Sequence, residues 1–335
     1  METKLTAGTK SVSAISVMRF LMKWEVILFI ILILLNVVNS MISPYYLSFN
    51  GLMDASLSFL DKSFIVFPMA MVILIGEIDI SVASTIALSS VLMGVSYSAG
   101  HGVPMIASMG ICLAAATTCG FINGFLLTKY RELSPMIVTL ATATIYRGIA
   151  YIILEDRAAG KFPVWFQYFG WGYVGPFPFM LVCFLACAVL FLFLMGKTTF
   201  GRRLYAIGSN RLASSYSGIK VARYRLIVYT LAGFMAGVTA IFLTSRMSST
   251  RPNIAMGYEL DIISMVVLGG ISTAGGKGSL IGALISIFII GLLKYGMGLL
   301  NFDAQILMII IGLLLVFSVM LPNLFTGHRI GIRKG

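Results

Sequence analysis

Charged residues are scarce in this chain of 335 residues. Asp, Glu, Lys and Arg together make up 11% of it, and only 12 residues are acidic. A soluble globular domain carries about 25% charged residues. Hydrophobic residues instead reach 59%, and several apolar runs approach the length of about 20 residues that crosses a bilayer. This composition excludes an ordinary soluble enzyme.

Histidine and cysteine are also rare. The two histidines, His101 and His328, lie far from every cysteine in the sequence. The cysteines form two pairs, Cys112 with Cys119 and Cys183 with Cys187, inside predicted helices. Small apolar packing explains such residues better than a metal site does. We expect no metal, no cofactor and no catalytic constellation.

A phosphate-binding loop is missing as well. The nearest candidate is the glycine-rich segment 269–279, but Ile271 stands where a Walker A motif requires glycine. Gly278 stands where the motif requires Ser or Thr. We therefore expect that this chain does not hydrolyse ATP alone. We interpret the segment as a glycine-rich turn between two spans.

The apolar runs predict an all-α, polytopic membrane protein with about ten transmembrane helices. Glycine, serine or charges interrupt the second, third and eighth runs. The expected spans are 25–43, 57–76, 80–99, 104–128, 135–154, 176–196, 225–245, 258–274, 279–300 and 303–322.

Basic residues gather in the segments that an inside N-terminus would place in the cytoplasm, which the positive-inside rule predicts. Both termini are then cytoplasmic. We expect a cytoplasmic leader at 1–23, a membrane domain at 24–323 and a cytoplasmic tail at 324–335. The net charge of +12 invites a nucleic-acid interpretation, but contact with anionic membrane lipid is enough to explain the distribution.

The segment 197–225 is the longest polar stretch, with seven Lys or Arg and no acid. Ser209 and Asn210 can cap a short helix, and Gly218 can end it. We predict a cytoplasmic helix at Asn210–Ser217, about 12 Å long at about 1.5 Å per residue. A capped helix exposed there indicates a docking element.

Acidic residues interrupt the apolar runs at the segment 76–81. Glu77 and Asp79 either lie in a wet turn at the interface or take part in gating, because a carboxylate in hydrocarbon costs about 2.5–3.5 kcal/mol. Arg147 lies about 12 residues into its span. It either snorkels to headgroups or is buried against helix-end carbonyls or a carboxylate, with Asp79 and Glu77 as possible partners.

Glu259 and Asp261 open the eighth span. They form either a polar helix start or an entrance to the transport path, where Arg246 and Arg251 would complement them. A weak internal echo links the hexamer Met71–Gly76 with Met265–Gly270. Such an echo is consistent with a duplicated helical pair, which transporter folds often contain, or with chance.

Several motifs resemble those of one family, the inner-membrane permease subunits of bacterial ABC importers for monosaccharides of the ribose, xylose, rhamnose and autoinducer-2 type. The resemblance covers roughly residues 50–323. Its motifs are GEIDISVAS, FINGFLLTKY followed by IVTLATATIYRG, GRRLYAIGSNRLASSYSGI, and GYELDIISMVVLGGISTAGGKGSLIG, which is the most specific.

The resemblance implies a path formed by two permease subunits, identical or related. It also implies a cytoplasmic ATPase that binds ATP and Mg²⁺, and a periplasmic sugar-binding protein. On this resemblance the loop 197–225 is the coupling element. Its docking candidates are Gly201, Arg202, Asn210, Arg211, Ser217 and Gly218.

The chain departs from the family pattern where Glu77 and Ala83 replace glycines. This difference points to the rhamnose or autoinducer-2 branches as the first to consider. The alternative function is an ion-coupled secondary transporter that uses Glu77, Asp79 and Arg147 as a relay. A purely structural membrane scaffold is a third class. Neither an ion-coupled transporter nor a scaffold has an obvious use for a capped basic loop.

Overall fold

The fold is helical throughout its described part. The computed structural model describes residues 24–98, 102–303, 305–310, 312–317 and 320. Two small two-stranded sheets and one 3₁₀ turn complete it. The helices are α2 (Trp24–Ile42), α3 (Phe49–Leu57), α4 (Leu60–Ser63), α5 (Val66–Leu74), α6 (Val82–Ser98), α7 (Met105–Lys129), α8 (Pro135–Leu154), α9 (Tyr168–Trp171), α10 (Phe179–Lys197), α11 (Thr199–Ser209), α12 (Arg211–Tyr216), α13 (Val221–Met247), α14 (Tyr258–Leu268) and α15 (Leu280–Leu299).

Among the described residues, six helices are long and apolar enough to cross a membrane: α2, α7, α8, α10, α13 and α15. A seventh span forms if α3 is taken together with the stretch Leu60–Leu74, which bends from it by 57°. The remaining apolar helices are shorter. This arrangement confirms a polytopic membrane protein with roughly ten helices.

The spans predicted at 57–76, 80–99 and 258–274 need correction. The first begins earlier, because Ser48 caps α3 by accepting a hydrogen bond from the amide of Gly51. The second shortens to α6. The third keeps only the eleven residues of α14, because the glycine-rich turn follows it. The last predicted span, 303–322, extends outside the described residues.

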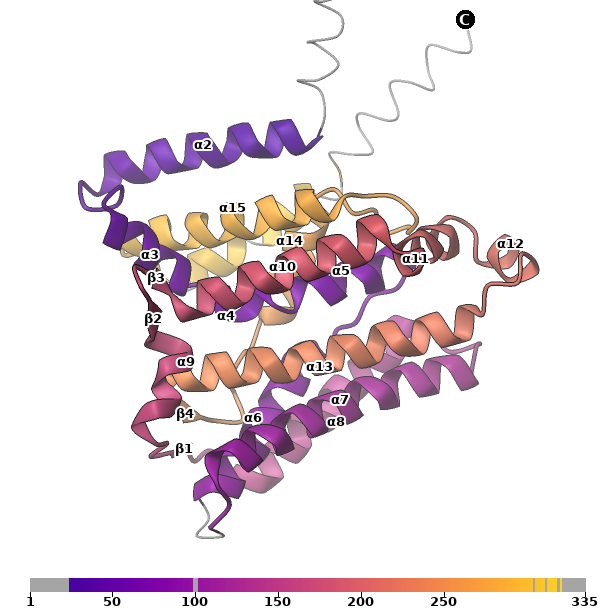
Figure 1. The fold of residues 1–335 in the computed structure, drawn as a ribbon, viewed down its shortest axis with the longest axis horizontal. Coiled ribbons are helices and arrows are strands. Elements are labelled where there is room, and N and C mark those ends of the chain that lie inside the picture. Colours follow the sequence, from indigo (N-terminus) through magenta and orange to yellow (C-terminus); the bar gives the residue numbers. More distant parts are fainter. Residues whose placement is uncertain (1–23, 99–101, 304, 311, 318–319, 321–335) are drawn as a thin grey trace, which may run out of the picture.

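The long helices lie roughly side by side, so the molecule has two ends (Figure 1). One end carries α11 and α12 and is called here the α12 end. The opposite end, called the strand end, carries α9 and the strands β1 (Ala159–Gly160), β2 (Tyr173–Val174), β3 (Phe177–Pro178) and β4 (Ser249–Thr250). The strands β1 and β4 pair antiparallel, as do β2 and β3.

Helices α7 and α13 pack closely along their length, and glycine allows the approach. A Cβ on Gly120 would lie 2.8 Å from the Cα of Gly233, and one on Gly233 would lie 2.8 Å from the Cα of Gly120. Each helix carries a second glycine four residues on, Gly124 and Gly237. Small residues at this spacing let membrane helices pack backbone to backbone.

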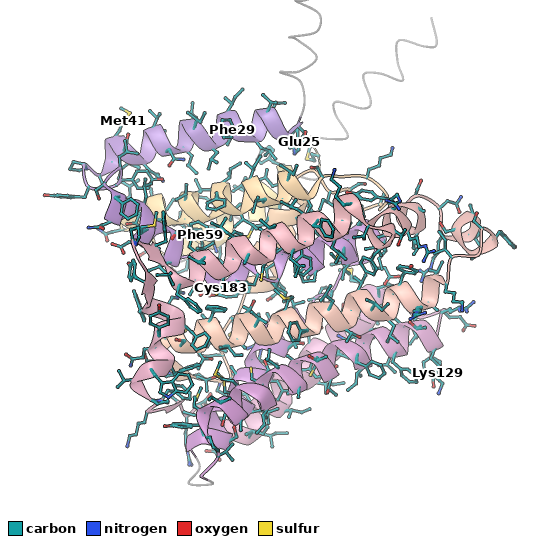
Figure 2. All side chains as sticks on the ribbon, viewed as in Figure 1. Glu25, Phe29, Met41, Phe59, Lys129 and Cys183 are labelled. Atoms are coloured by element: carbon teal, nitrogen blue, oxygen red, sulfur yellow. The ribbon has the colours of Figure 1, made fainter. Side chains whose placement is uncertain are left out.

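Helix α2 packs on the other side of the bundle, against α15. The side-chain amide of Asn39 donates to the carbonyl of Leu292 at 3.0 Å, and the indole of Trp24 donates to Leu268 at 2.8 Å. The remainder of α2 is largely exposed and apolar. Phe29 and Met41 point away from the bundle in Figure 2, with exposures of 54% and 82%. Such a surface suits lipid or another membrane subunit.

Candidate functional site: two helix breaks and the segment that contacts both

The two echoing hexamers end their helices in the same way. After α5, the amide of Glu77 donates to the carbonyl of Val72, and Gly76 has a φ of +79°. After α14, the amide of Ile271 donates to Val266, and Gly270 has a φ of +87°. Each is a Schellman motif, in which a left-handed glycine closes the helix end. The sequence echo is therefore a repeated backbone structure.

The two breaks meet at the α12 end. The amide of Gly276, in the turn after α14, donates to the carbonyl of Leu74 at the end of α5, at 2.8 Å. The end of helix α11 packs against the same contact. A Cβ on Gly208 would collide with the carbonyl oxygen of Leu74 and the amide nitrogen of Gly276. The end of α11 thus touches both breaks through backbone atoms.

A side chain strengthens this contact. The hydroxyl of Tyr205 on α11 donates to the carbonyl of Gly278 at 3.0 Å. Burial raises the pKa of Tyr205, so the phenol stays protonated and keeps donating. This hydrogen bond ties α11 to the turn between α14 and α15.

The helix predicted at Asn210–Ser217 exists, with corrected bounds. It is α12, six residues long, and the side chain of Asn210 caps it by accepting from the amide of Ala213 at 2.9 Å. Gly218 follows it with a φ of +81°. Ser209 does not cap α12, because it is the last residue of α11. The sequence interpretation missed α11 itself.

Most of the docking candidates are exposed, including Arg202, Asn210, Arg211, Ser217 and Gly218. Gly201 is buried instead. Its backbone packs so closely on the end of α10 that a Cβ there would collide with the carbonyl of Met195. The sequence interpretation did not single out two apolar side chains on α12. Leu212 and Tyr216 are 71% and 89% exposed and lie one helical turn apart.

Glu77 joins α12 to the first break. Its carboxylate is 2.8 Å from Nε of Arg225 on α13 and 3.1 Å from Nη1 of Arg211, the first residue of α12. Glu77 and Arg225 are buried, and Arg225 also donates through Nη1 to the carbonyl of Leu127. The wet-turn interpretation of Glu77 is therefore wrong. Both arginine partners of Glu77 come from the basic segment 197–225.

Asp79 is buried too, and it organises the start of α6. Its Oδ1 accepts from the amide of Ser81 at 2.8 Å and from the Ser81 hydroxyl at 2.6 Å. Asn123 on α7 donates to that hydroxyl at 2.8 Å, and Tyr146 on α8 donates to Asn123 at 3.2 Å. A hydrogen-bonded chain thus holds α6, α7 and α8 together, and Asp79 is not in a wet turn.

Arg147 is half-buried and reaches the strand end. Its Nη1 donates to the carbonyls of Pro252 and Ile254, at 2.6 and 2.8 Å. These carbonyls belong to the segment that precedes α14. Asp79 and Glu77 are not its hydrogen-bond partners, so that suggested pairing is wrong. Arg147 holds the segment between β4 and α14 in place.

Asp261 lies in a buried network of charges that the sequence analysis did not recognise. Its Oδ2 is 2.7 Å from Nζ of Lys62 on α4 and 2.5 Å from Nζ of Lys294 on α15. Arg246 was expected to complement Asp261, but it pairs with Asp61 at 2.7 Å. The network ties α4, α13, α14 and α15 together near the strand end.

Glu259 lies two residues before Asp261 but in a different setting. It lines a hollow on the surface formed by α6, α8 and the start of α14, together with Arg147. Its Oε2 is buried and has no hydrogen-bond partner among the described residues. Arg251 remains exposed and forms no ion pair within the described part of the chain.

Residues 52–319 match the family described as the permease component of the branched-chain amino acid transport system. This range contains both breaks, α11, α12 and every ion pair described above. The chain belongs to this permease family. It is accordingly a multi-pass membrane protein that forms the permease component of a transport system.

Several curated relatives are similar over nearly the whole chain. The ribose import permease protein RbsC of Bacillus subtilis is 36% identical over 88% of this chain and 91% of its own length. The autoinducer 2 import system permease protein LsrD of Yersinia enterocolitica is 32% identical, over 88% of this chain and 90% of its own. The LsrD protein of Photorhabdus temperata is also 32% identical over the same shares. No solved structure matches this chain.

Proposed function

We propose that this permease is the membrane subunit of an ATP-driven importer for a monosaccharide or a related small sugar. The relatives whose names specify ribose and autoinducer 2 support this substrate class. In this proposal the protein lies in the bacterial inner membrane with its α12 end in the cytoplasm. The basic residues around α12 support that orientation by the positive-inside rule.

One observation carries the coupling mechanism: the α11–α12 segment contacts both helix breaks. Gly208 packs on Leu74 and Gly276, while Arg211 reaches Glu77. In the proposal a force on α12 passes through these contacts to α5, α6 and the turn before α15. Packed backbone contacts transmit such a displacement because they cannot be compressed.

The proposed partner at α12 is a cytoplasmic ATPase that carries ATP and Mg²⁺, since the glycine-rich turn 269–279 lacks the residues of a phosphate-binding loop. Leu212 and Tyr216 supply an exposed apolar pair for a cleft in that subunit. A basic hollow of about 700 Å³ beside α12 would receive acidic groups. It is lined in part by Arg131, Arg211, Lys220, Arg223 and Arg225.

Two further partners complete the proposal. A second permease subunit covers the face that α8 exposes, and a periplasmic sugar-binding protein delivers the substrate at the strand end. Exposed apolar side chains along α8, such as Ile137 at 69% and Ile152 at 82%, support burial against another subunit or lipid.

The ion-coupled alternative has less support. A proton or ion relay would need Glu77, Asp79 and Arg147 within reach of one another. Glu77 is instead neutralised by two arginines, Asp79 is engaged by Ser81, and Arg147 binds carbonyls at the strand end. The three side chains form no mutual hydrogen bond or ion pair.

Reconstitution tests the proposal. The permease is placed in liposomes with its ATPase and binding protein, and uptake of labelled ribose and other small sugars is measured with and without ATP. The expected result is uptake that requires ATP, the ATPase and the binding protein. Uptake that follows an imposed ion gradient in the absence of the ATPase would contradict it.

A further inference from the structure

The basic hollow beside α12 carries more positive charge than the described part of the protein neutralises. It has a volume of about 700 Å³ and lies between α12 and the neighbouring ends of α7 and α13 (Figure 1). Glu77 neutralises part of its charge, through Arg211 and Arg225. Three further basic side chains on its wall are exposed and form no ion pair within the described ranges: Arg131, Lys220 and Arg223. The hollow therefore favours an anionic ligand.

The hollow lies where two membrane helices reach the edge of the bilayer. Thr128 on its wall belongs to the last turn of α7, and Val221 begins α13. Tyr130 directly follows α7, and Tyr224 lies in the first turn of α13. Tyrosine gathers at the level of the lipid headgroups, because its ring is apolar and its hydroxyl is polar. The hollow thus lies at the depth of a lipid phosphate.

Exposed apolar side chains lead from the hollow along both helices towards the middle of the membrane. On α13, Ile227 and Phe234 follow Arg223 on the same face and are 39% and 41% exposed. On α7, Phe121 and Phe125 are both 45% exposed, and their ring centroids are 6.1 Å apart. Two apolar rows that begin at one charged hollow match the two acyl chains and the phosphate of a phospholipid.

A cytoplasmic ATPase would account for less of this surface. Acidic groups of such a subunit can reach the hollow from the cytoplasm. The apolar rows, however, extend along α7 and α13 into the membrane, where a soluble subunit does not reach. Basic pockets between membrane helices bind the headgroups of anionic lipids. A lipid therefore explains both the charge of the hollow and the apolar rows beside it.

We infer that this hollow is a binding site for one anionic phospholipid. Arg131, Lys220 and Arg223 bind its phosphate, while the exposed rows on α7 and α13 contact its acyl chains. The first turn of α13 lines the hollow too, so the positive end of that helix adds to the attraction. The inference goes beyond the proposed function, because it requires only that the α12 end lies at a membrane surface.

The first test measures lipid binding to the full-length permease in a mild detergent. Phosphatidylglycerol is titrated against the purified protein, and phosphatidylcholine with the same acyl chains is the neutral reference. We expect phosphatidylglycerol to raise the thermal midpoint in a saturable way and phosphatidylcholine to raise it much less. Binding should weaken as salt is added, because the contact is ionic. Equal effects of the two lipids would overturn the site.

The second test changes the wall of the hollow. The double variant Lys220→Gln with Arg223→Gln removes two exposed cations, each of which contributes about fivefold to the affinity for an anionic lipid surface. It should bind phosphatidylglycerol about twentyfold more weakly or less tightly still. Lys277→Gln is the matched control, because Lys277 is exposed at the same end and lies outside the lining of the hollow. Wild-type affinity in the double variant would overturn the assignment.

Two further arms distinguish the source of the anion. Glycerol phosphate that stabilises the permease as strongly as phosphatidylglycerol does would overturn the lipid site, because the acyl chains would then contribute nothing. Unchanged lipid affinity in the double variant, together with weaker binding of the ATPase, would assign the hollow to the ATPase instead. None of these measurements uses sugar or ATP-driven uptake, so the inference and the proposed function fail separately.

Discussion

Nη1 of Arg211 lies 3.1 Å from Oε1 of Glu77, although 134 residues separate them in the sequence. One partner begins the exposed helix α12, and the other follows the Schellman motif that ends α5. The guanidinium is half-exposed, whereas the carboxylate is buried and shared with Arg225. The buried pair is thus Glu77 with Arg225, and Arg211 is the solvent-exposed partner, which we expect to separate more easily.

Replacement of Arg211 should therefore uncouple the transporter without unfolding it. Arg211→Gln removes an exposed partner, and exposed ion pairs contribute about 1 kcal/mol or less to stability. We expect a thermal midpoint close to that of the wild type in detergent, but fewer sugar molecules transported per ATP hydrolysed. Lys129→Gln is the control, because Lys129 is exposed, lies outside the lining of the basic hollow and forms no ion pair among the described residues. Equal coupling in the two variants would contradict this assignment.

Removal of Arg225 should act on stability instead. Arg225→Met leaves Glu77 buried with only the half-exposed Arg211, and a broken buried pair costs about 3–5 kcal/mol. The expected result is a clearly lower thermal midpoint and poor recovery from the membrane. The double variant Glu77→Gln with Arg225→Met should recover part of the loss. Failure of the second change to restore any stability would show that the pair is not the cause.

Gly208 offers a test of the backbone contact. Gly208→Ala introduces a Cβ that collides with Leu74 and Gly276, so α11 must separate from the two breaks. We expect low coupling of ATP hydrolysis to uptake or a loss of folded protein. Gly196→Ala is the matched control, because a Cβ there has no neighbour within 4 Å. Wild-type transport by Gly208→Ala would mean that α11 does not need this contact.

The left-handed residue after α12 gives a conformational test. Gly218 has a φ of +81°, where a β-branched side chain costs about 1–2 kcal/mol or more. Gly218→Val should disturb the exit of α12 and uncouple ATPase activity from transport. Gly218→Asn should retain coupling, because asparagine tolerates this conformation. Equal coupling in the two variants would refute a role for the left-handed turn.

The long apolar helices followed directly from the sequence. The helices α7, α8, α10, α13 and α15 lie within a few residues of their predicted spans, because each contains a predominantly apolar run of bilayer length. The cap at Asn210 and the turn at Gly218 were also predictable, since both depend on local chemistry.

The broken helices and their ion pairs were harder to predict from the sequence. Helix α3 was missed because Asp54 and its glycine and serine neighbours hide a helix that is not apolar throughout. The pairing of Asp261 with Lys62 and Lys294 joins segments up to 199 residues apart, and nothing in the local sequence encodes it. The echo between Met71–Gly76 and Met265–Gly270 was a usable signal, because the same residues produce the same helix end.

The most direct test of the account is a double-mutant cycle between Glu77 and Arg211, with sugar molecules transported per ATP hydrolysed as the readout. Glu77→Gln, Arg211→Gln and the double variant are compared with the wild type in the reconstituted importer. If the contact carries the signal from α12 to the first break, the double variant should be no worse than the more impaired single variant. Fully additive losses would show that the two residues act independently and would contradict the coupling mechanism.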